Sequence, residues 1–261
     1  MIDLHSHVLW NRDGTAVPED LCMDRLREAC KDGVTDLVVT PYIRRGVTER
    51  SWQSIVDRVE AVKTKAFGAG IPVRLYAGAE LELDDHIWHF LWADKPDYCL
   101  AGSHYVLLSV RGSADPGYVE RTLYEMMLKG FQPIITRAEL SPFFYEYPQR
   151  LLNWLHQGAI LQCDMASYAG FFSDSSRRRA ENFVQHHMVT LLGSGTEAKI
   201  PYDAMAATAE KTITDLDVPW DTWNKCKNNS ERVLADRLFY PLLPEYWETP
   251  HRSLFARLFG L

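Results

Sequence analysis

Apolar residues along the chain form two alternating patterns: short continuous runs, and stripes with the spacing of an α-helix. The short runs predict strands over residues 1–7, 36–40, 73–80, 105–110, 132–136, 160–165 and 189–192. The stripes predict helices over residues 18–31, 49–69, 115–129, 148–157, 175 onward, 204–215 and 222–227. Strands that alternate with helices are typical of a parallel sheet, so we expect an α/β fold that closes, or nearly closes, into a barrel.

The end of the chain falls outside this alternation. Within residues 241–261, an apolar stripe with helical spacing is made by Leu254, Phe255, Leu258 and Phe259. This stripe indicates a helix docked on the barrel, and the alternative is a helix that binds a partner or a membrane surface. We therefore expect a barrel domain over residues 1–240 and a C-terminal extension over residues 241–261.

Composition limits the classes of function that the chain can have. A net charge of −7 over 261 residues argues against a broad nucleic-acid surface, which requires a basic face. The 5 cysteines are scattered without a C-x-x-C pair, which indicates reduced thiols in a cytoplasmic protein. Because the chain has no long apolar run, we expect neither a signal peptide nor a transmembrane helix.

Two histidines end the first predicted strand, His5 and His7. In a strand, residues i and i+2 point to the same face, so the two imidazoles lie side by side. A structural pair of histidines is the plain alternative, but strand ends are where α/β folds build their sites. Glu80 follows the third strand and would reach the same edge, where the three side chains suit Zn, Mn or Fe. Asp13, in the first loop, offers a further carboxylate.

Four segments carry a resemblance to a known family: M-I-D-L-H-S-H, V-V-T-P-Y-x-R-R-G, Y-A-G-A-E-L and S-H-Y-V-L-L. Over residues 1–235 the chain resembles the PHP (polymerase and histidinol phosphatase) superfamily. The most similar branch is the manganese-dependent bacterial protein-tyrosine phosphatases encoded with capsule and exopolysaccharide genes. The resemblance implies a distorted (β/α)7 TIM-like barrel and a three-metal cluster. It also implies hydrolysis of a phosphomonoester, such as phosphotyrosine in a protein, by a metal-bound hydroxide.

The resemblance also implies roles for individual residues. The positions that match metal ligands are His5, His7, Asp13 and Glu80. Arg44 and Arg45 match a basic pair beside the site, where bidentate arginine suits a phosphate. Manganese is the metal that the resemblance implies, with zinc or iron as alternatives.

The chain departs from the family pattern at several ligand positions. Tyr42 and Arg137 stand where histidines are expected, Ser109 stands for an acid, and Gly195 and Glu197 replace an aspartate and a histidine. Arg137 stays protonated and cannot bind a metal, although its charge could attract a substrate anion. Glu197 could still bind a hard cation.

These departures leave more than one function open. We expect fewer than three metal ions and a phosphoric monoester hydrolase weakened by the loss of ligands. The alternative is a catalytically inactive pseudo-phosphatase that binds a phosphorylated or acidic partner in polysaccharide production. A third reading is a metal-dependent hydrolase of a different ester.

Overall fold

The computed structural model describes residues 1–92, 95–146, 148–197, 200–202 and 204–245. Its strands are β1 (Ile2–Ser6), β2 (Asp36–Val39), β3 (Tyr42–Ile43), β4 (Arg74–Ala77), β5 (Glu80–Glu82), β6 (Tyr105–Ser109), β7 (Gln132–Thr136), β8 (Ile160–Asp164) and β9 (Val189–Gly193). Its α-helices are α1 (Glu19–Lys31), α2 (Trp52–Gly68), α3 (Pro116–Leu128), α4 (Pro142–Glu146), α5 (Pro148–His156), α6 (Met165–Tyr168), α7 (Asp174–Gln185), α8 (Met205–Thr214) and α9 (Thr222–Leu234). Short 3-10 helices cover Ile87–His89 and Leu100–Gly102.

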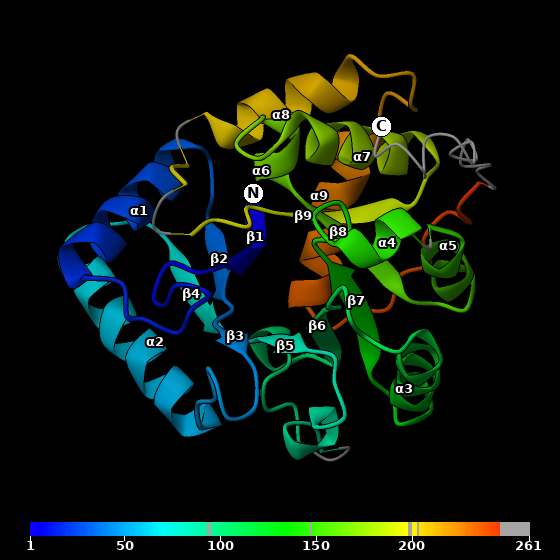
Figure 1. The fold of residues 1–261 in the computed structure, drawn as a ribbon. Coiled ribbons are helices and arrows are strands. Elements are labelled where there is room, and N and C mark those ends of the chain that lie inside the picture. Colours follow the sequence, from blue (N-terminus) through cyan, green and yellow to red (C-terminus); the bar gives the residue numbers. More distant parts are fainter. Residues whose placement is uncertain (93–94, 147, 198–199, 203, 246–261) are drawn as a thin grey trace.

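The strands form two parallel sheets, in the orders β1-β2-β4 and β3-β5-β6-β7-β8-β9. Helices α1, α2, α3, α7 and α8 lie outside the strands, which occupy the centre of the molecule (Figure 1). The predicted α/β fold, with parallel strands that alternate with helices, is therefore confirmed. The single closed barrel is not: within the described ranges the two sheets do not join into one closed ladder.

The break between the two sheets has a local cause in the sequence. Thr40 and Pro41 separate β2 from β3, and Gly78 and Ala79 separate β4 from β5. Proline has no N–H to donate, so it interrupts a ladder of backbone hydrogen bonds. The neighbouring strands still stay side by side, because Gly78 N donates to Val39 O at 3.0 Å and Glu80 N donates to Pro41 O at 3.0 Å.

Helix starts follow ordinary capping chemistry. The Ser51 side chain accepts a hydrogen bond from Ser54 N at the start of α2, and the Asp115 side chain accepts one from Tyr118 N at the start of α3. Each cap satisfies a backbone N–H that has no partner inside its own helix. The helices that the sequence predicts between residues 18 and 227 are present, and α9 runs further than expected, to Leu234. The short helices α4 and α6 were not predicted.

One face of the strands changes from apolar to polar towards the C-terminal ends. Ile134 and Ile160 belong to a buried apolar cluster, and the residues two positions later, Thr136 and Gln162, are buried polar residues. Residues i and i+2 of a strand share a face, so the polar pair lies directly above the apolar cluster. Buried polar side chains at the C-terminal ends of these strands therefore pack directly against a buried apolar cluster.

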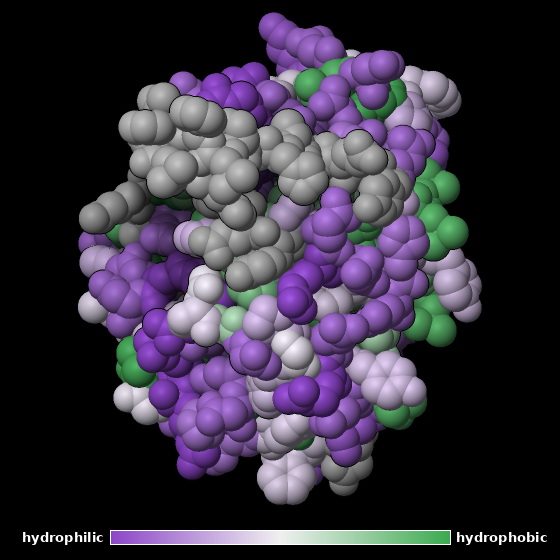
Figure 2. All heavy atoms as spheres, turned by 45° about the vertical axis from the view of Figure 1, so that its right-hand side comes forward, coloured by the Kyte–Doolittle hydropathy of each residue, from purple (hydrophilic) through white to green (hydrophobic). Residues whose placement is uncertain are grey.

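The outer surface is mostly polar on the face that Figure 2 shows, where hydrophilic residues predominate and hydrophobic ones form separate patches. Among the described residues, no helix has both the length and the apolar character needed to cross a bilayer. Residues 241–245 contain no helix, and the apolar stripe from Leu254 to Phe259 lies outside the described residues. The docked C-terminal helix therefore stays a prediction.

Candidate metal centre

β1, the residue His7 just after it, and β5 bring two imidazoles and one carboxylate together. Glu80 Oε2 lies 3.2 Å from His5 Nε2 and 3.0 Å from His7 Nε2. The two Nε2 atoms are 3.2 Å apart, and all three side chains are fully buried. One ligand atom from each residue lies within 4.8 Å of the others. The structure thus brings these three residues together as the sequence predicted, and their role as metal ligands stays a prediction.

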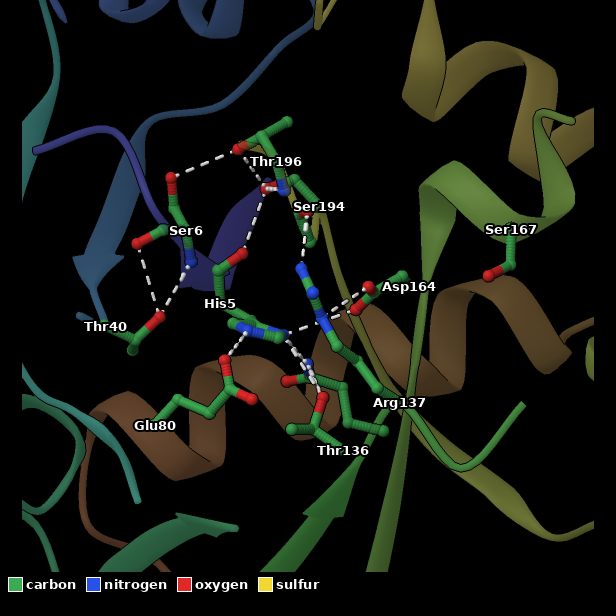
Figure 3. A network of polar contacts seen from close by, with 12 residues as sticks. His5, Ser6, Thr40, Glu80, Thr136, Arg137, Asp164, Ser167, Ser194 and Thr196 are labelled. Carbon is green, nitrogen blue, oxygen red and sulfur yellow. Dashed lines mark hydrogen bonds and ion pairs between the residues drawn. The ribbon is translucent and has the colours of Figure 1, made fainter. Parts of the chain in front are cut away.

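The far side of the His5 ring is held by three polar groups (Figure 3). Its Nδ1 atom lies 3.1 Å from Thr136 Oγ1, 3.0 Å from Gln162 Nε2 and 3.3 Å from Asp164 Oδ1. Partners on one ring nitrogen fix the orientation of the other, and metal-binding histidines are usually held in this way. The contacts therefore aim His5 Nε2 at Glu80.

The pKa values of two of the three side chains in this group are shifted in the direction that suits a cation. Burial would raise the pKa of Glu80, but Arg12 and the two histidines outweigh it and hold that pKa well below its ordinary value. Burial lowers the pKa of His7 to about 4, so this ring is neutral at pH 7. Burial would also lower the pKa of His5, but Asp164 and Glu80 together raise it. A carboxylate and neutral imidazoles are the forms that bind metals, so the lowered pKa values of Glu80 and His7 favour a cation, whereas the raised pKa of His5 acts against one.

The first loop supplies an arginine where an aspartate was expected. Arg12 donates from its Nη1 to Glu80 Oε1 at 2.7 Å, and its guanidinium lies 4.3 Å from the centre of the Tyr42 ring. Asp13 instead accepts hydrogen bonds from Thr15 N and Thr15 Oγ1, at 2.8 and 2.7 Å. The structure therefore does not bring Asp13 into the group, because its carboxylate turns back onto its own loop.

Arg137 fills the space beside His5. Its Nε lies 3.0 Å from Asp164 Oδ2, its Nη1 lies 3.2 Å from Glu197 Oε1, and its Nη2 donates to Gly195 O at 2.8 Å. Burial would lower the pKa of Arg137, but the surrounding carboxylates, Asp164 first among them, outweigh it and raise that pKa. Glu197 was expected as a ligand, but it faces this guanidinium and is not a member of the three-residue group.

Two glycines allow the close approach of these side chains. A Cβ atom on Gly195 would stand 2.0 Å from Asp164 Oδ2, and the φ of Gly195 is +61°. A Cβ atom on Gly193 would stand 2.6 Å from His5 Cβ and 2.7 Å from Gln162 Nε2. Glycine is needed at both positions because side-chain atoms already occupy that space.

The other two departures from the family pattern do not provide ligands to this group. Tyr42 donates a hydrogen bond to Glu82 Oε2, and burial followed by Glu82 raises the pKa of the Tyr42 hydroxyl. Ser109 pairs with Glu82 in the sheet and is buried, and its Oγ has no hydrogen-bond partner among the described residues. Both side chains therefore belong to the surroundings of Glu82, two residues along β5 from Glu80.

A pocket of about 390 Å³ is lined by Arg44, Arg45 and Arg111 together with acidic residues, among them Glu82, which lies two residues along β5 from Glu80. Glu82 Oε1 lies 3.5 Å from Arg44 Nε and 3.3 Å from Arg111 Nη1, while Arg45 Nη1 lies 3.2 Å from His86 Nδ1. Three guanidinium groups in one pocket are suited to a phosphate or a carboxylate. Arg111 is a residue that sequence reasoning missed.

A further buried acid follows β7. Glu139 Oε1 accepts hydrogen bonds from Asp164 N and Ser167 Oγ, both at 2.9 Å. Burial, and then the charge of Asp164, raise the pKa of Glu139 to about 7. This carboxyl group fixes the backbone at the end of β8 and hence the position of Asp164.

Sequence reasoning also missed four residues that contact His5 or Glu80. These are Arg12, Thr136, Gln162 and Asp164, each of which contacts His5 or Glu80. Thr136 and Asp164 are the last residues of β7 and β8, so the strand-end argument that selected Glu80 could have selected them as well.

The fold and the site define an α/β protein with a buried His-His-Glu group, in which His5 and His7 lie at the C-terminal end of β1 and Glu80 begins β5. The family model described as "Capsular polysaccharide synthesis, CpsB/CapC" matches residues 1–209, and the chain belongs to this family. The resemblance predicted from the sequence is thereby confirmed.

Two curated relatives illustrate the similarity. The chain is 24% identical over 194 residues to "Tyrosine-protein phosphatase YwqE" of Bacillus subtilis (strain 168), covering 74% of this chain and 76% of the relative. It is 22% identical over 210 residues to "Tyrosine-protein phosphatase CpsB" of Streptococcus pneumoniae, covering 77% of this chain and 86% of the relative.

Solved structures agree on the fold. A structure described as one of "YwqE from Bacillus subtilis and CpsB from Streptococcus pneumoniae, unique metal-dependent tyrosine phosphatases" superposes with a TM-score of 0.87 at 20% identity, covering 95% of this chain and 100% of that one. A phosphotriesterase homology protein from Escherichia coli has a TM-score of 0.56 at 10% identity, covering 88% of this chain and 97% of that one. At these identities the likeness shows the fold alone.

Proposed function

We propose that this protein is a metal-dependent phosphatase of capsular or exopolysaccharide production that acts on phosphotyrosine in a protein. The observation that carries the proposal is the convergence of His5, His7 and Glu80 on one point inside a fully buried site. Membership of the CpsB/CapC family and the names of the relatives, which are tyrosine-protein phosphatases, support the choice of substrate.

The donor set suits one divalent cation. His5, His7 and Glu80 would hold it, with manganese the first choice and zinc or iron as alternatives. The spacing of 3.0 to 3.2 Å between their ligand atoms, and the orientation of His5 from its far side, both fit such a role. When bound, the cation activates water and polarises the phosphoryl group. We expect fewer than three ions, because the other candidate acids, Asp13 and Glu197, face Thr15 and Arg137.

The arginine pocket would hold the phosphate. Arg44, Arg45 and Arg111 line it, and Glu82 lies within 3.5 Å of Arg44 and 3.3 Å of Arg111. An incoming phosphate can replace the Glu82 contacts with bidentate contacts to the same guanidinium groups. Arg137 adds a fixed positive charge next to His5, which favours an anion at the site. A single cation stabilises less transition-state charge than a cluster, so we expect turnover weaker than that of a site with every ligand present.

The test uses the full chain, purified without chelators and without a metal-affinity tag. Elemental analysis gives the metal content, and hydrolysis of an aryl phosphate with added manganese gives the activity. We expect bound metal and measurable turnover, both lost in His7→Ala and kept in His156→Ala, which changes an exposed histidine on α5. If the wild-type chain binds a phosphotyrosine peptide but neither metal nor hydrolysis is detected, the chain is a pseudo-phosphatase and the proposal fails.

The finer architecture and the domain limits are part of the proposal. We propose that the two sheets form the wall of one distorted (β/α)7 TIM-like barrel, in which β2 continues into β3 and β4 into β5. The parallel bridge between Ser6 and Thr196, which brings the end of β1 beside the segment after β9, supports this arrangement. The barrel domain would comprise residues 1–240, and a chain truncated after residue 240 should unfold cooperatively within a few degrees of the full chain.

The state of the cysteines supports a reducing compartment. All 5 cysteines are free thiols, and 4 of them are buried. We propose the cytoplasm as the place where the protein acts, since disulfides are rare there.

A further inference from the structure

The Arg137 side chain is surrounded by oxygen atoms of the kind that bind divalent cations. Two carboxylates and one carbonyl face it: Asp164 Oδ2 at 3.0 Å, Glu197 Oε1 at 3.2 Å and Gly195 O at 2.8 Å. The arginine is 7% exposed. Carboxylate and carbonyl oxygens are the ligands preferred by hard cations such as Mn²⁺ and Mg²⁺. A guanidinium therefore stands where the surrounding atoms would suit a metal ion.

Asp164 is oriented towards cationic groups and not towards ordinary hydrogen-bond donors. The residue is fully buried, and its Oδ1 and Oδ2 have no hydrogen-bond partner among the described residues. Its oxygens instead form ion pairs with His5 Nδ1 at 3.3 Å and with Arg137 Nε at 3.0 Å. Buried polar atoms without a hydrogen-bond partner need an explanation, and here the two positively charged neighbours of Asp164 provide it.

The backbone is adapted to bring the guanidinium into this position. Arg137 has a φ of 57°, in the left-handed region that residues with a side chain seldom adopt. Gly195 has no Cβ, which leaves the Asp164 carboxylate room to reach the guanidinium. Figure 3 shows the Arg137 side chain lying beside Asp164 and extending towards the turn that contains Ser194.

We propose that Arg137 is a built-in cation: its guanidinium occupies a second cation position, formed by Asp164, Glu197 and the Gly195 carbonyl, next to the His5-His7-Glu80 group. This inference rests on the proposed metal centre, whose ligand His5 contacts Asp164 of the second position through its Nδ1 atom. Since the position is already filled, the wild-type centre takes a single metal ion. Removal of the guanidinium leaves two carboxylates and a carbonyl without a counter-charge, and a second ion then binds there.

The experiment measures manganese binding to the full chain by calorimetric titration, with electron paramagnetic resonance of the loaded protein as a second readout. The wild-type protein should bind a single ion and give the spectrum of isolated Mn²⁺. Arg137→Gln should bind a second ion and give the spectrum of an exchange-coupled pair, because the two positions are adjacent. Arg178→Gln, which changes an exposed arginine on α7, is the control and should behave as the wild type does.

A second pair of variants tests which oxygens form the position. In the Arg137→Gln background, adding Glu197→Gln should weaken the second ion by at least about tenfold and leave the first unchanged. In the otherwise wild-type chain, Glu197→Gln should keep the single ion, since Glu197 holds Arg137 and not the metal. This last variant changes a partly exposed side chain, so its manganese content can be measured even if Arg137→Gln does not fold.

The outcomes separate the two proposals. A single ion in both the wild type and Arg137→Gln overturns the built-in cation and leaves the metal centre standing. A second ion already present in the wild type, or loss of the single ion in Glu197→Gln, also overturns it. If the wild-type protein binds no manganese at all, the metal centre of the proposed function fails, and this inference fails with it.

Discussion

Asp164 Oδ1 lies 3.3 Å from His5 Nδ1, on the side of the imidazole away from Glu80. The carboxylate therefore acts on the proposed metal centre through the orientation and basicity of one ligand. We expect Asp164→Asn to weaken manganese binding by about 10- to 100-fold, as is typical when a partner of a ligating histidine is lost. Isothermal titration calorimetry with the full chain measures this directly.

The matched control for that variant is Asp174→Asn, which changes an exposed carboxylate at the start of α7. It should bind manganese as the wild type does. Equal affinities for Asp164→Asn and the wild type would mean that Thr136 and Gln162 orient His5 without the carboxylate.

The arginine pocket predicts a defect in anion binding. Arg44→Ala removes a guanidinium that lies 3.5 Å from Glu82 in the pocket, and we expect the KM for an aryl phosphate to rise by about tenfold. Arg27→Ala, on the surface of α1, should leave the KM unchanged. A KM that does not move in Arg44→Ala, Arg45→Ala or the double variant would remove the pocket from substrate binding.

The core under α2 predicts a clear difference in stability between two positions of the same helix. Ile55 is fully buried, so Ile55→Ala should lower the free energy of unfolding by about 2–5 kcal/mol. Phe67 is 87% exposed, so Phe67→Ala should change it by less than about 0.5 kcal/mol. Urea unfolding followed by circular dichroism compares the two, and similar losses would show that α2 packs differently.

An ion pair at the N-terminal end of the strands predicts a dependence of stability on pH. Arg74 donates to both Asp36 oxygens at 2.6 Å, and although burial acts in the opposite direction, these bonds lower the pKa of Asp36. A carboxyl whose pKa is lowered by folding stabilises the protein above its unfolded pKa, and this contribution is lost as the pH falls through the folded pKa. Asp36→Asn should therefore be less stable than the wild type at pH ~7, with the gap closing towards pH ~3.

Thermal unfolding across that pH range measures the effect. Asp217→Asn, at an exposed position in the turn after α8, provides the comparison and should follow the wild type at every pH. A constant gap between Asp36→Asn and the wild type would contradict the ionic origin of the stabilisation.

The sequence predicted the central group because its signal is local and geometric. His5 and His7 are two residues apart in a strand, and Glu80 ends a neighbouring run, so periodicity and strand order suffice to bring them together. The position of Asp13, which the structure does not bring into this group, was not predictable for the opposite reason. Whether Arg12 or Asp13 turns inward depends on the path of the first loop, which is set by contacts with distant residues such as Tyr42.

The fold was likewise predictable where it depends on local patterns in the sequence. The alternating apolar patterns identified parallel strands and their helices, but the break in the ladder at Pro41 depends on a single proline just after a predicted strand, which those patterns do not register. In the same way, the sequence identified Arg137 as a departure, while its ion pairs with Asp164 and Glu197 required strands β7 and β8 to be placed in three dimensions.

The packing of Gly195 against Asp164 restricts the order in which substitutions can accumulate. A Cβ at position 195 would lie 2.0 Å from Asp164 Oδ2, so an aspartate cannot be introduced there while Asp164 keeps its present position. Asp164 is in turn held by Arg137, whose charge it balances. A mutational path that places a side chain at 195 must therefore first change position 164, or position 137 so that Asp164 can move, because a side chain introduced at 195 beforehand overlaps with the Asp164 carboxylate.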